Sequence, residues 1–78
     1  MSSYYFHLVE ADRVIEATEP QPFDDRDSAM DDAKRQICHM LSLELLESRT
    51  IDLNRSIRID GPDGPASVAF ADAIVLRA

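Results

Sequence analysis

The sequence is poor in the residues that proteins use for cross-links, phosphate binding and membrane insertion. It has one cysteine, Cys38, so no disulfide can form within the chain. The only two glycines, Gly61 and Gly64, lie in one short stretch, which leaves no glycine-rich phosphate-binding loop. No apolar run approaches the roughly 20 residues needed to span a bilayer, so we expect no membrane contact.

Positive charge is also scarce. The chain has 8 basic and 15 acidic residues, and its formal net charge is −7. Long-range repulsion of phosphate makes direct binding of nucleic acid unfavourable, whereas a basic protein would be attracted. The N-terminus lacks the basic region and apolar core of a signal peptide, so we expect a soluble cytoplasmic protein.

The residues that bind metals or act as nucleophiles are few and unsuitably spaced. His7, Cys38 and His39 are the soft metal ligands, and no pair has the spacing of a zinc site. Cys38 and His39 are neighbours in a predicted helix, where they point about 100° apart and cannot act as nucleophile and base. We interpret His7 as a solvent-facing strand residue and Cys38 as a small apolar filler. The sequence therefore predicts a protein that is not an enzyme and binds no metal or cofactor.

One long helix is predicted from about residue 25 to residue 48. Asp24 and Asp25 are N-cap candidates, and no glycine or proline interrupts the segment. Apolar residues recur at steps of three and four, which places them on one stripe. These residues are Ala29, Met30, Ala33, Ile37, Met40 and Leu41.

Segments with the alternating pattern of strands lie on both sides of this helix. We predict strands at residues 3–10, 13–18, 56–60 and 66–71. The order is β-β-α-β-β, which favours a single α+β domain over residues 1–78, with an antiparallel sheet and the helix packed across one face. The predicted core side chains are Tyr4, Phe6, Leu8, Val14, Ala33, Ile37, Leu41, Ile57, Ile59, Val68 and Phe70.

The connecting segments carry their own predictions. Two prolines in residues 19–23 remove strand donors, so we interpret that segment as a connector, from which Phe23 packs against the first helical turn. We expect Ile51 and Leu53 to tuck under the sheet edge. Residues 61–65, Gly-Pro-Asp-Gly-Pro, are the clearest turn, and residues 72–78 form a tail that fits either a short turn or an extended edge.

Four short motifs occur together in the sequence: Tyr-Tyr-Phe-His-Leu at residues 4–8, Ala29-x-x-x-Ala33 after an acidic cap, Asp63-Gly64, and Phe70-x-Asp72-Ala73. These motifs resemble those of a family of small bacterial proteins catalogued only as a domain of unknown function. The resemblance covers nearly the whole chain and implies a β-β-α-β-β fold without any activity. The first hairpin turn departs from the family, because Ala11-Asp12 stands where members usually carry glycine. More loosely, a hairpin followed by an acid-capped helix looks like small antitoxins that sequester a partner protein.

The second half of the predicted helix contains more leucine than one buried stripe requires. Leu43, Leu45 and Leu46 make this half apolar nearly all round. Either the tail or the segment after the helix covers the excess, or the leucines form an interface.

We predict an interaction module that binds and masks a basic, DNA-binding regulator, as an antiactivator or antitoxin-like inhibitor does. Leu43 and Leu46 are the predicted anchors, and the predicted steering charges are Asp31, Asp32, Glu44 and Glu47. The alternative is a small structural or stress-related homodimer without a second kind of partner.

Overall fold

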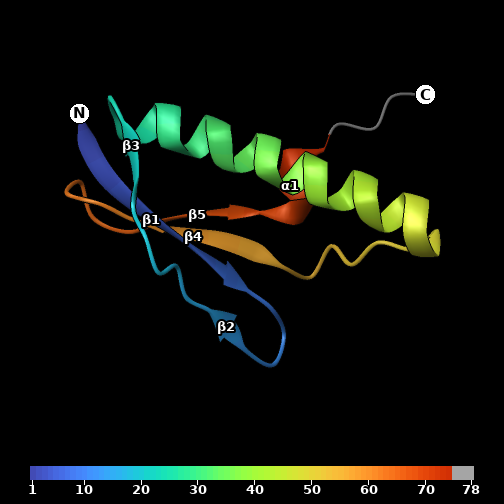
Figure 1. The fold of residues 1–78 in the computed structure, drawn as a ribbon. Helices are drawn as coiled ribbons and strands as arrows, with labels where there is room; N and C mark the ends of the chain where they lie inside the picture. The colour runs from blue at the N-terminus through green and yellow to red at the C-terminus, as the bar shows by residue number, and fades with distance from the viewer. Residues whose placement is uncertain (75–78) are drawn as a thin grey trace.

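The protein is an antiparallel sheet with one long helix along one of its faces (Figure 1). A computed structural model describes residues 1–74 of the chain. This architecture confirms the predicted α+β class. The elements are β1 (Ser2–Val9), β2 (Val14–Ile15), β3 (Gln21–Phe23), α1 (Arg26–Ser48), β4 (Ser56–Asp60), β5 (Ala66–Ala69) and the short 3-10 helix η1 (Phe70–Ala73).

The first strand lies at the centre of the sheet. The strand order is β2-β1-β4-β5, and every pairing is antiparallel. β4 runs along β1 with Tyr5 opposite Asp60 and Val9 opposite Ser56. Because side chains alternate along a strand, Tyr4 and Phe6 point to the face that α1 covers, while Tyr5 points to the open face.

The edge beside β1 differs from its prediction. The strand expected over residues 13–18 is wrong in length, because β2 spans only Val14–Ile15, and the expected connector contains β3. Pro22 is tolerated there because β3 is an edge strand, where a missing N–H costs no ladder bond. Between the two pairings, residues 16–20 lie opposite residues 5–7 of β1, so two extra residues bulge out of the ladder.

The helix has the predicted bounds, and both ends are capped. Ser28 N–H donates to Asp25 Oδ1 at 2.8 Å, so Asp25 is the N-cap. Arg49 ends the helix in the left-handed region at φ 59°, and its N–H donates to the Leu45 carbonyl at 3.1 Å.

The core lies between α1 and the sheet, and most of it was predicted. Phe23 stacks on Phe6, with ring centroids 5.7 Å apart, and so closes the core beside β1. Val14 was wrongly placed in the core, since the two-residue β2 leaves it half-exposed, and Leu8 is only partly buried. The buried apolar side chains are Tyr4, Phe6, Ala29, Ala33, Ile37, Leu41, Ile57, Ile59, Val68 and Phe70.

Two predictions about the second half of the chain need correction. Ile51 and Leu53 are exposed and do not tuck under the sheet edge; the segment is held at the residue between them, where Arg55 Nε donates to the Asp52 carbonyl at 3.0 Å. The last strand ends at Ala69 and gives way to η1. The part of the predicted tail beyond residue 74 lies outside the described residues.

The predicted turn between β4 and β5 is present. Gly64 N–H donates to the Gly61 carbonyl at 3.1 Å, and Gly64 takes a positive φ of 92°. Pro62 and Asp63 occupy the two central positions. The buried ring of Tyr4 lies directly against the Cα of Gly61, where a Cβ atom would overlap it.

Candidate functional site

The two flanks of α1 face different parts of the molecule. A buried stripe packs on the sheet, and on one side of it Gln36 Nε2 donates to Gln21 Oε1 of β3 at 3.3 Å. On the other side, Cys38 Sγ donates to the Ala73 carbonyl of η1 at 3.5 Å. We call these the β3 flank and the η1 flank.

The surplus leucines are divided between these flanks. Leu43 follows Gln36 and Met40 at helical steps of four and three and so lies on the β3 flank, whereas Leu45 follows Cys38 on the η1 flank. Leu46 comes one step of three after Leu43, next to the β3 flank on the outer face of the helix, nearly opposite the buried stripe. Leu46 is 82% exposed, Leu45 49% and Leu43 46%. Leu43 and Leu45 therefore face opposite sides of the helix, and Leu46 lies nearer to Leu43 than to Leu45.

The β3 flank carries the stronger candidate for a binding surface. An open hollow of about 360 Å³ lies there, lined by Arg35, Gln36, His39 and Met40. Leu43 and Leu46 follow within two helical turns of Met40, and Glu47 lies one turn after Leu43. Met40, Leu43, Leu46 and Glu47 together form what we call the leucine flank.

The predicted steering acids do not all belong to this surface. Asp31 accepts from Arg35 Nη2 at 2.8 Å, and Asp32 accepts from Gln36 Nε2 at 2.8 Å. Both lie roughly 15 Å or more before Leu43 along the helix axis, from the rise of about 1.5 Å per residue. Glu47 is the exposed acid that lies beside the leucines.

Glu44 has a structural partner that the sequence did not reveal. Arg55 Nη2 donates to Glu44 Oε1 at 2.6 Å, and this bond lowers the pKa of Glu44 below its ordinary value. The Arg55 side chain is only 8% exposed, and its guanidinium lies 4.4 Å from the centre of the Phe70 ring. Arg55 thus clamps α1, the segment before β4 and η1 together. No local pattern marks it, because its partners come from distant parts of the chain.

His7 is a second polar residue whose prediction was wrong. It was expected to face solvent, but it is 9% exposed. Its Nδ1 accepts from Ala17 N–H at 3.0 Å, so Nε2 carries the proton and donates to Asp60 Oδ2 at 3.0 Å. The bulge beside β1 contributes to this burial, because it brings the Ala17 amide to the edge of the ring at Nδ1. Both ring nitrogens of His7 are therefore hydrogen-bonded within the protein.

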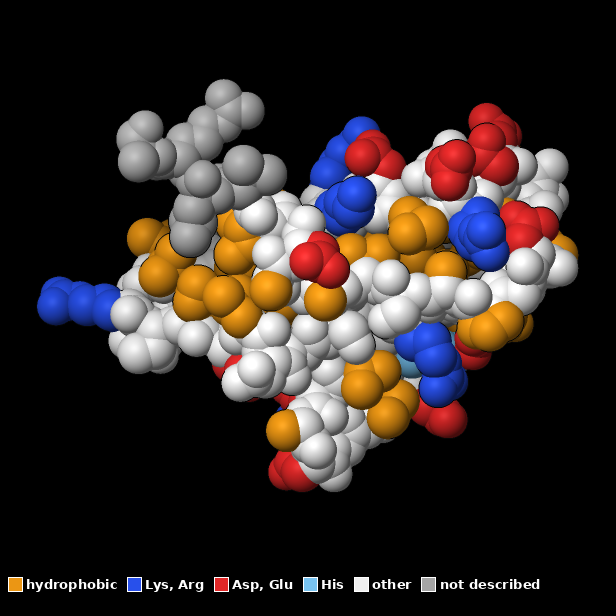
Figure 2. Space-filling view, turned by 180° about the vertical axis from the view of Figure 1, so that it is seen from behind, with side chains coloured by type: hydrophobic (Ala, Val, Ile, Leu, Met, Phe, Trp, Pro, Cys, Tyr) orange, Lys and Arg blue, Asp and Glu red, His pale blue; other side chains and the backbone are white. Residues whose placement is uncertain are grey.

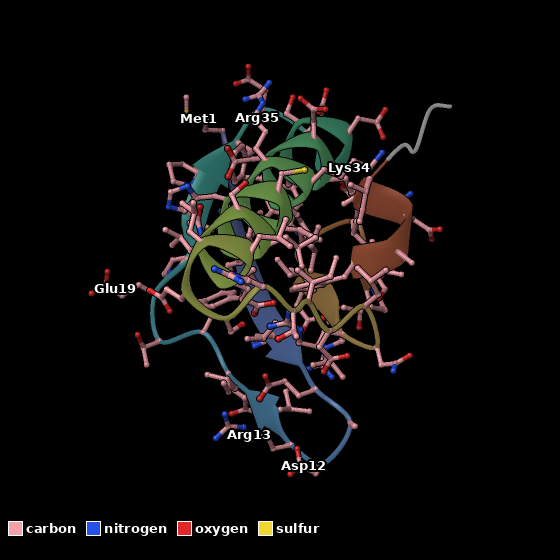
Figure 3. The ribbon with its side chains drawn as sticks, turned by 90° about the vertical axis from the view of Figure 1, so that its right-hand side faces the viewer. Met1, Asp12, Arg13, Glu19, Lys34 and Arg35 are labelled. Atoms are coloured by element: carbon pink, nitrogen blue, oxygen red, sulfur yellow. The ribbon has the colours of Figure 1, made fainter. Side chains whose placement is uncertain are left out.

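The remaining candidates for chemistry are dispersed. Cys38 is exposed and is not the buried filler that was predicted, because it lies on the outer part of the η1 flank. Within residues 1–74, no group of three or more His, Cys, Asp and Glu side chains is placed to hold a metal ion. Figure 3 shows Asp12 and Arg13 at the tip of the β1–β2 loop, at the opposite end of the view from Lys34 and Arg35.

Comparisons with known proteins return no match to a family model, to a curated protein or to a solved structure. The resemblance to a bacterial domain of unknown function stays a prediction. In the part of the chain that the structure describes, no helix is long and apolar enough to cross a membrane.

Proposed function

We propose that the protein is a non-enzymatic interaction module that binds a basic regulatory protein through the leucine flank of α1. The observation that carries this proposal is the 82% exposure of Leu46, beside the half-exposed Leu43. Covering large apolar side chains releases them from water, and a central apolar anchor is typical of protein interfaces.

The net charge of −7 supports a basic partner. Opposite charge speeds the encounter, and contact with Leu43 and Leu46 then slows dissociation. A DNA-binding regulator fits this charge, because it presents a cationic surface to phosphate. Binding of this protein to the cationic surface of the regulator would mask that surface from DNA, as an antiactivator does.

The test compares the parent chain with Leu46→Gln as bait in lysate of the source cells. Leu45→Gln is the matched control, because it makes the same change on the η1 flank. We expect a basic protein that the parent and the control retain and Leu46→Gln loses. Burying one leucine is worth about 1.5–3 kcal/mol, so the Kd of the purified pair should rise roughly 10- to 100-fold, mainly through faster dissociation.

The acids should affect a different step. Replacing Asp32 by Asn and Glu47 by Gln should slow association and reduce its dependence on salt, while dissociation changes little. An unfolded Leu46→Gln variant would assign the leucine to the core and reject the leucine flank. A folded variant that binds the same partner as tightly as the parent would move the binding surface elsewhere.

A further inference from the structure

The two outer edges of the sheet are built differently. Native proteins protect exposed edges with prolines, charges, bulges and very short strands. The edge beside β1 has all four: β2 has two residues, β3 contains Pro22, and the bulged segment between them contains Glu16 and Glu19. Figure 3 shows Glu19 projecting outward from this segment.

The opposite edge, β5, has none of these protections. Its four residues are Ala66, Ser67, Val68 and Ala69, without charge, proline or bulge, and β4 is its only partner strand among residues 1–74. An uncharged, regular edge in a chain of net charge −7 is suited to pairing with another strand.

The ladder with β4 shows which groups of β5 point outward. Phe70 N–H donates to the Arg55 carbonyl at 2.9 Å, so the Arg55–Phe70 pair is hydrogen-bonded. Hydrogen-bonded pairs alternate along an antiparallel ladder, so Val68 and Ala66 also bond to β4. The N–H and C=O groups of Ser67 and Ala69 therefore point away from β4, toward the free edge.

We propose that β5 pairs antiparallel with β5 of a second copy of this chain. With Val68 opposite Val68 of the other copy, Ser67 lies opposite Ala69, and each such pair exchanges two hydrogen bonds. This register uses all the outward groups of Ser67 and Ala69. It also keeps each side chain on its own face, so both helices lie on the same side of one continuous sheet.

A second copy fits this edge because the strand is complementary to itself. The paired residues are small or apolar, so the twofold arrangement places no like charges opposite one another. The η1 flank of α1 lies on the same side of the molecule as β5, because η1 contacts both elements. This flank holds an apolar hollow of about 250 Å³, lined by Cys38, Leu41, Ser42, Leu45, Ile51 and Ile74. Figure 2 shows hydrophobic side chains gathered at the end of the molecule where α1 finishes. The twofold arrangement turns the two η1 flanks toward each other.

This proposal does not depend on the proposed function. The leucine flank lies on the β3 side of α1, away from β5, so it stays open in the dimer. The two associations also respond oppositely to salt. Screening weakens attraction to a basic partner but relieves repulsion between two chains of charge −7, so the dimer should strengthen as salt rises.

The test is the molar mass of the full chain by light scattering, with the variants Ser67→Pro and Ser67→Thr. Proline removes only the outward N–H of Ser67 and leaves the bonds to β4 intact, whereas threonine keeps that N–H. We expect the parent and Ser67→Thr to have twice the mass of one chain and Ser67→Pro to have the mass of a single chain.

Amide hydrogen exchange of the parent provides a readout that needs no variant. The Ser67 and Ala69 amides should exchange slowly at high protein concentration and at least tenfold faster on dilution into the monomer. A parent that stays monomeric near 1 mM overturns the proposal. So does a dimer in which these two amides exchange freely, or their protection only by a different protein.

Discussion

Gly61 is the residue at which the smallest added group should have a large effect. The ring of Tyr4 is buried against it, and the Tyr4 hydroxyl donates to Asp63 Oδ2 at 3.1 Å, so the ring is held at both ends. The methyl group of Gly61→Ala would overlap that ring. We expect a loss of about 2–3 kcal/mol in the free energy of unfolding, measured by urea denaturation.

The control for this prediction lies in the same turn. Gly64→Asn introduces a larger side chain where a Cβ meets no atom within 4 Å, and asparagine tolerates the positive φ of 92°. Its unfolding midpoint should shift less than half as far. Equal midpoints for Gly61→Ala and the parent would show that Tyr4 does not hold this position.

At Arg49, a substitution should stabilise the protein, because the backbone there lies in the left-handed region, which is unfavourable for residues with a Cβ atom. Its φ of 59° ends α1 in the left-handed conformation that glycine adopts without steric cost. Arg49→Gly should raise the free energy of unfolding by about 0.5–1 kcal/mol. The comparison with Arg49→Ala isolates the backbone effect, because both variants lose the same charge. A glycine variant no more stable than the alanine variant would contradict this prediction.

Single residues also show where a sequence pattern is insufficient. Alternation placed His7 on the face away from the helix, which is correct, but it could not show that a bulged segment would cover that face. The role of Arg55 could not be predicted for a similar reason, because its partners are distant in the sequence. Glu44 is separated from it by the end of α1 and a loop, and Phe70 by the hairpin of β4 and β5. Burial of polar side chains depends on these distant neighbours.

At the scale of elements, the Arg55 clamp predicts a pH dependence. The hydrogen bond from Arg55 lowers the pKa of Glu44 from its usual 4.5, so folding favours the charged form. This stabilisation is fully present above pH 4.5 and is lost as the pH falls through the lowered pKa. Glu44→Gln should lower the free energy of unfolding by about 2 kcal/mol at pH 7. The difference from the parent should shrink below pH 4.5, as urea titrations across this range would show.

The control for the clamp is Glu47→Gln, which removes an acid from the same helix outside the Arg55 contact. This variant should differ little from the parent at any pH. A Glu44→Gln variant whose deficit is as large at pH 3 as at pH 7 would indicate a loss of packing and not of the ion pair.

The elements differ in how far local sequence determines them. α1 was predicted closely because its cap, its apolar spacing and the absence of glycine and proline all lie within the segment. β3 was missed because Pro22 is unfavourable in most strands, and only its place at a sheet edge makes it acceptable. β2 was overestimated because Glu16 to Thr18 alternates like a strand but leaves the ladder at the bulge.

At the scale of the whole molecule, the candidate site was predicted in composition but not in arrangement. The excess of leucine was visible in the sequence, and the exposure of Leu43, Leu45 and Leu46 agrees with it. Which flank each leucine occupies depends on where β3 and η1 lie against α1. The spacing of residues along the helix does not predict those positions. The acids were grouped by sequence alone, whereas Arg55 holds Glu44 and the length of the helix separates Asp31 from Leu43.

The two proposed surfaces give the assembled protein a simple geometry. Pairing through β5 would join two chains into one sheet and leave one leucine flank on each outer side. A dimer would therefore present two equal sites with a combined charge of twice −7. Two sites on one particle raise the effective concentration of the second binding event when the regulator is itself dimeric.

The central position of β1 has a consequence for the order of events during synthesis. β1 is synthesised before all the strands that it pairs with, and its longest pairing is with β4, which follows about fifty residues later. Until β4 has emerged, Tyr4 and Phe6 have only the short β2 and β3 beside them, and α1 has no complete surface to pack on. The nascent chain therefore carries an unfinished apolar strand during the interval between the synthesis of β1 and that of β4, and in that interval a chaperone can bind it.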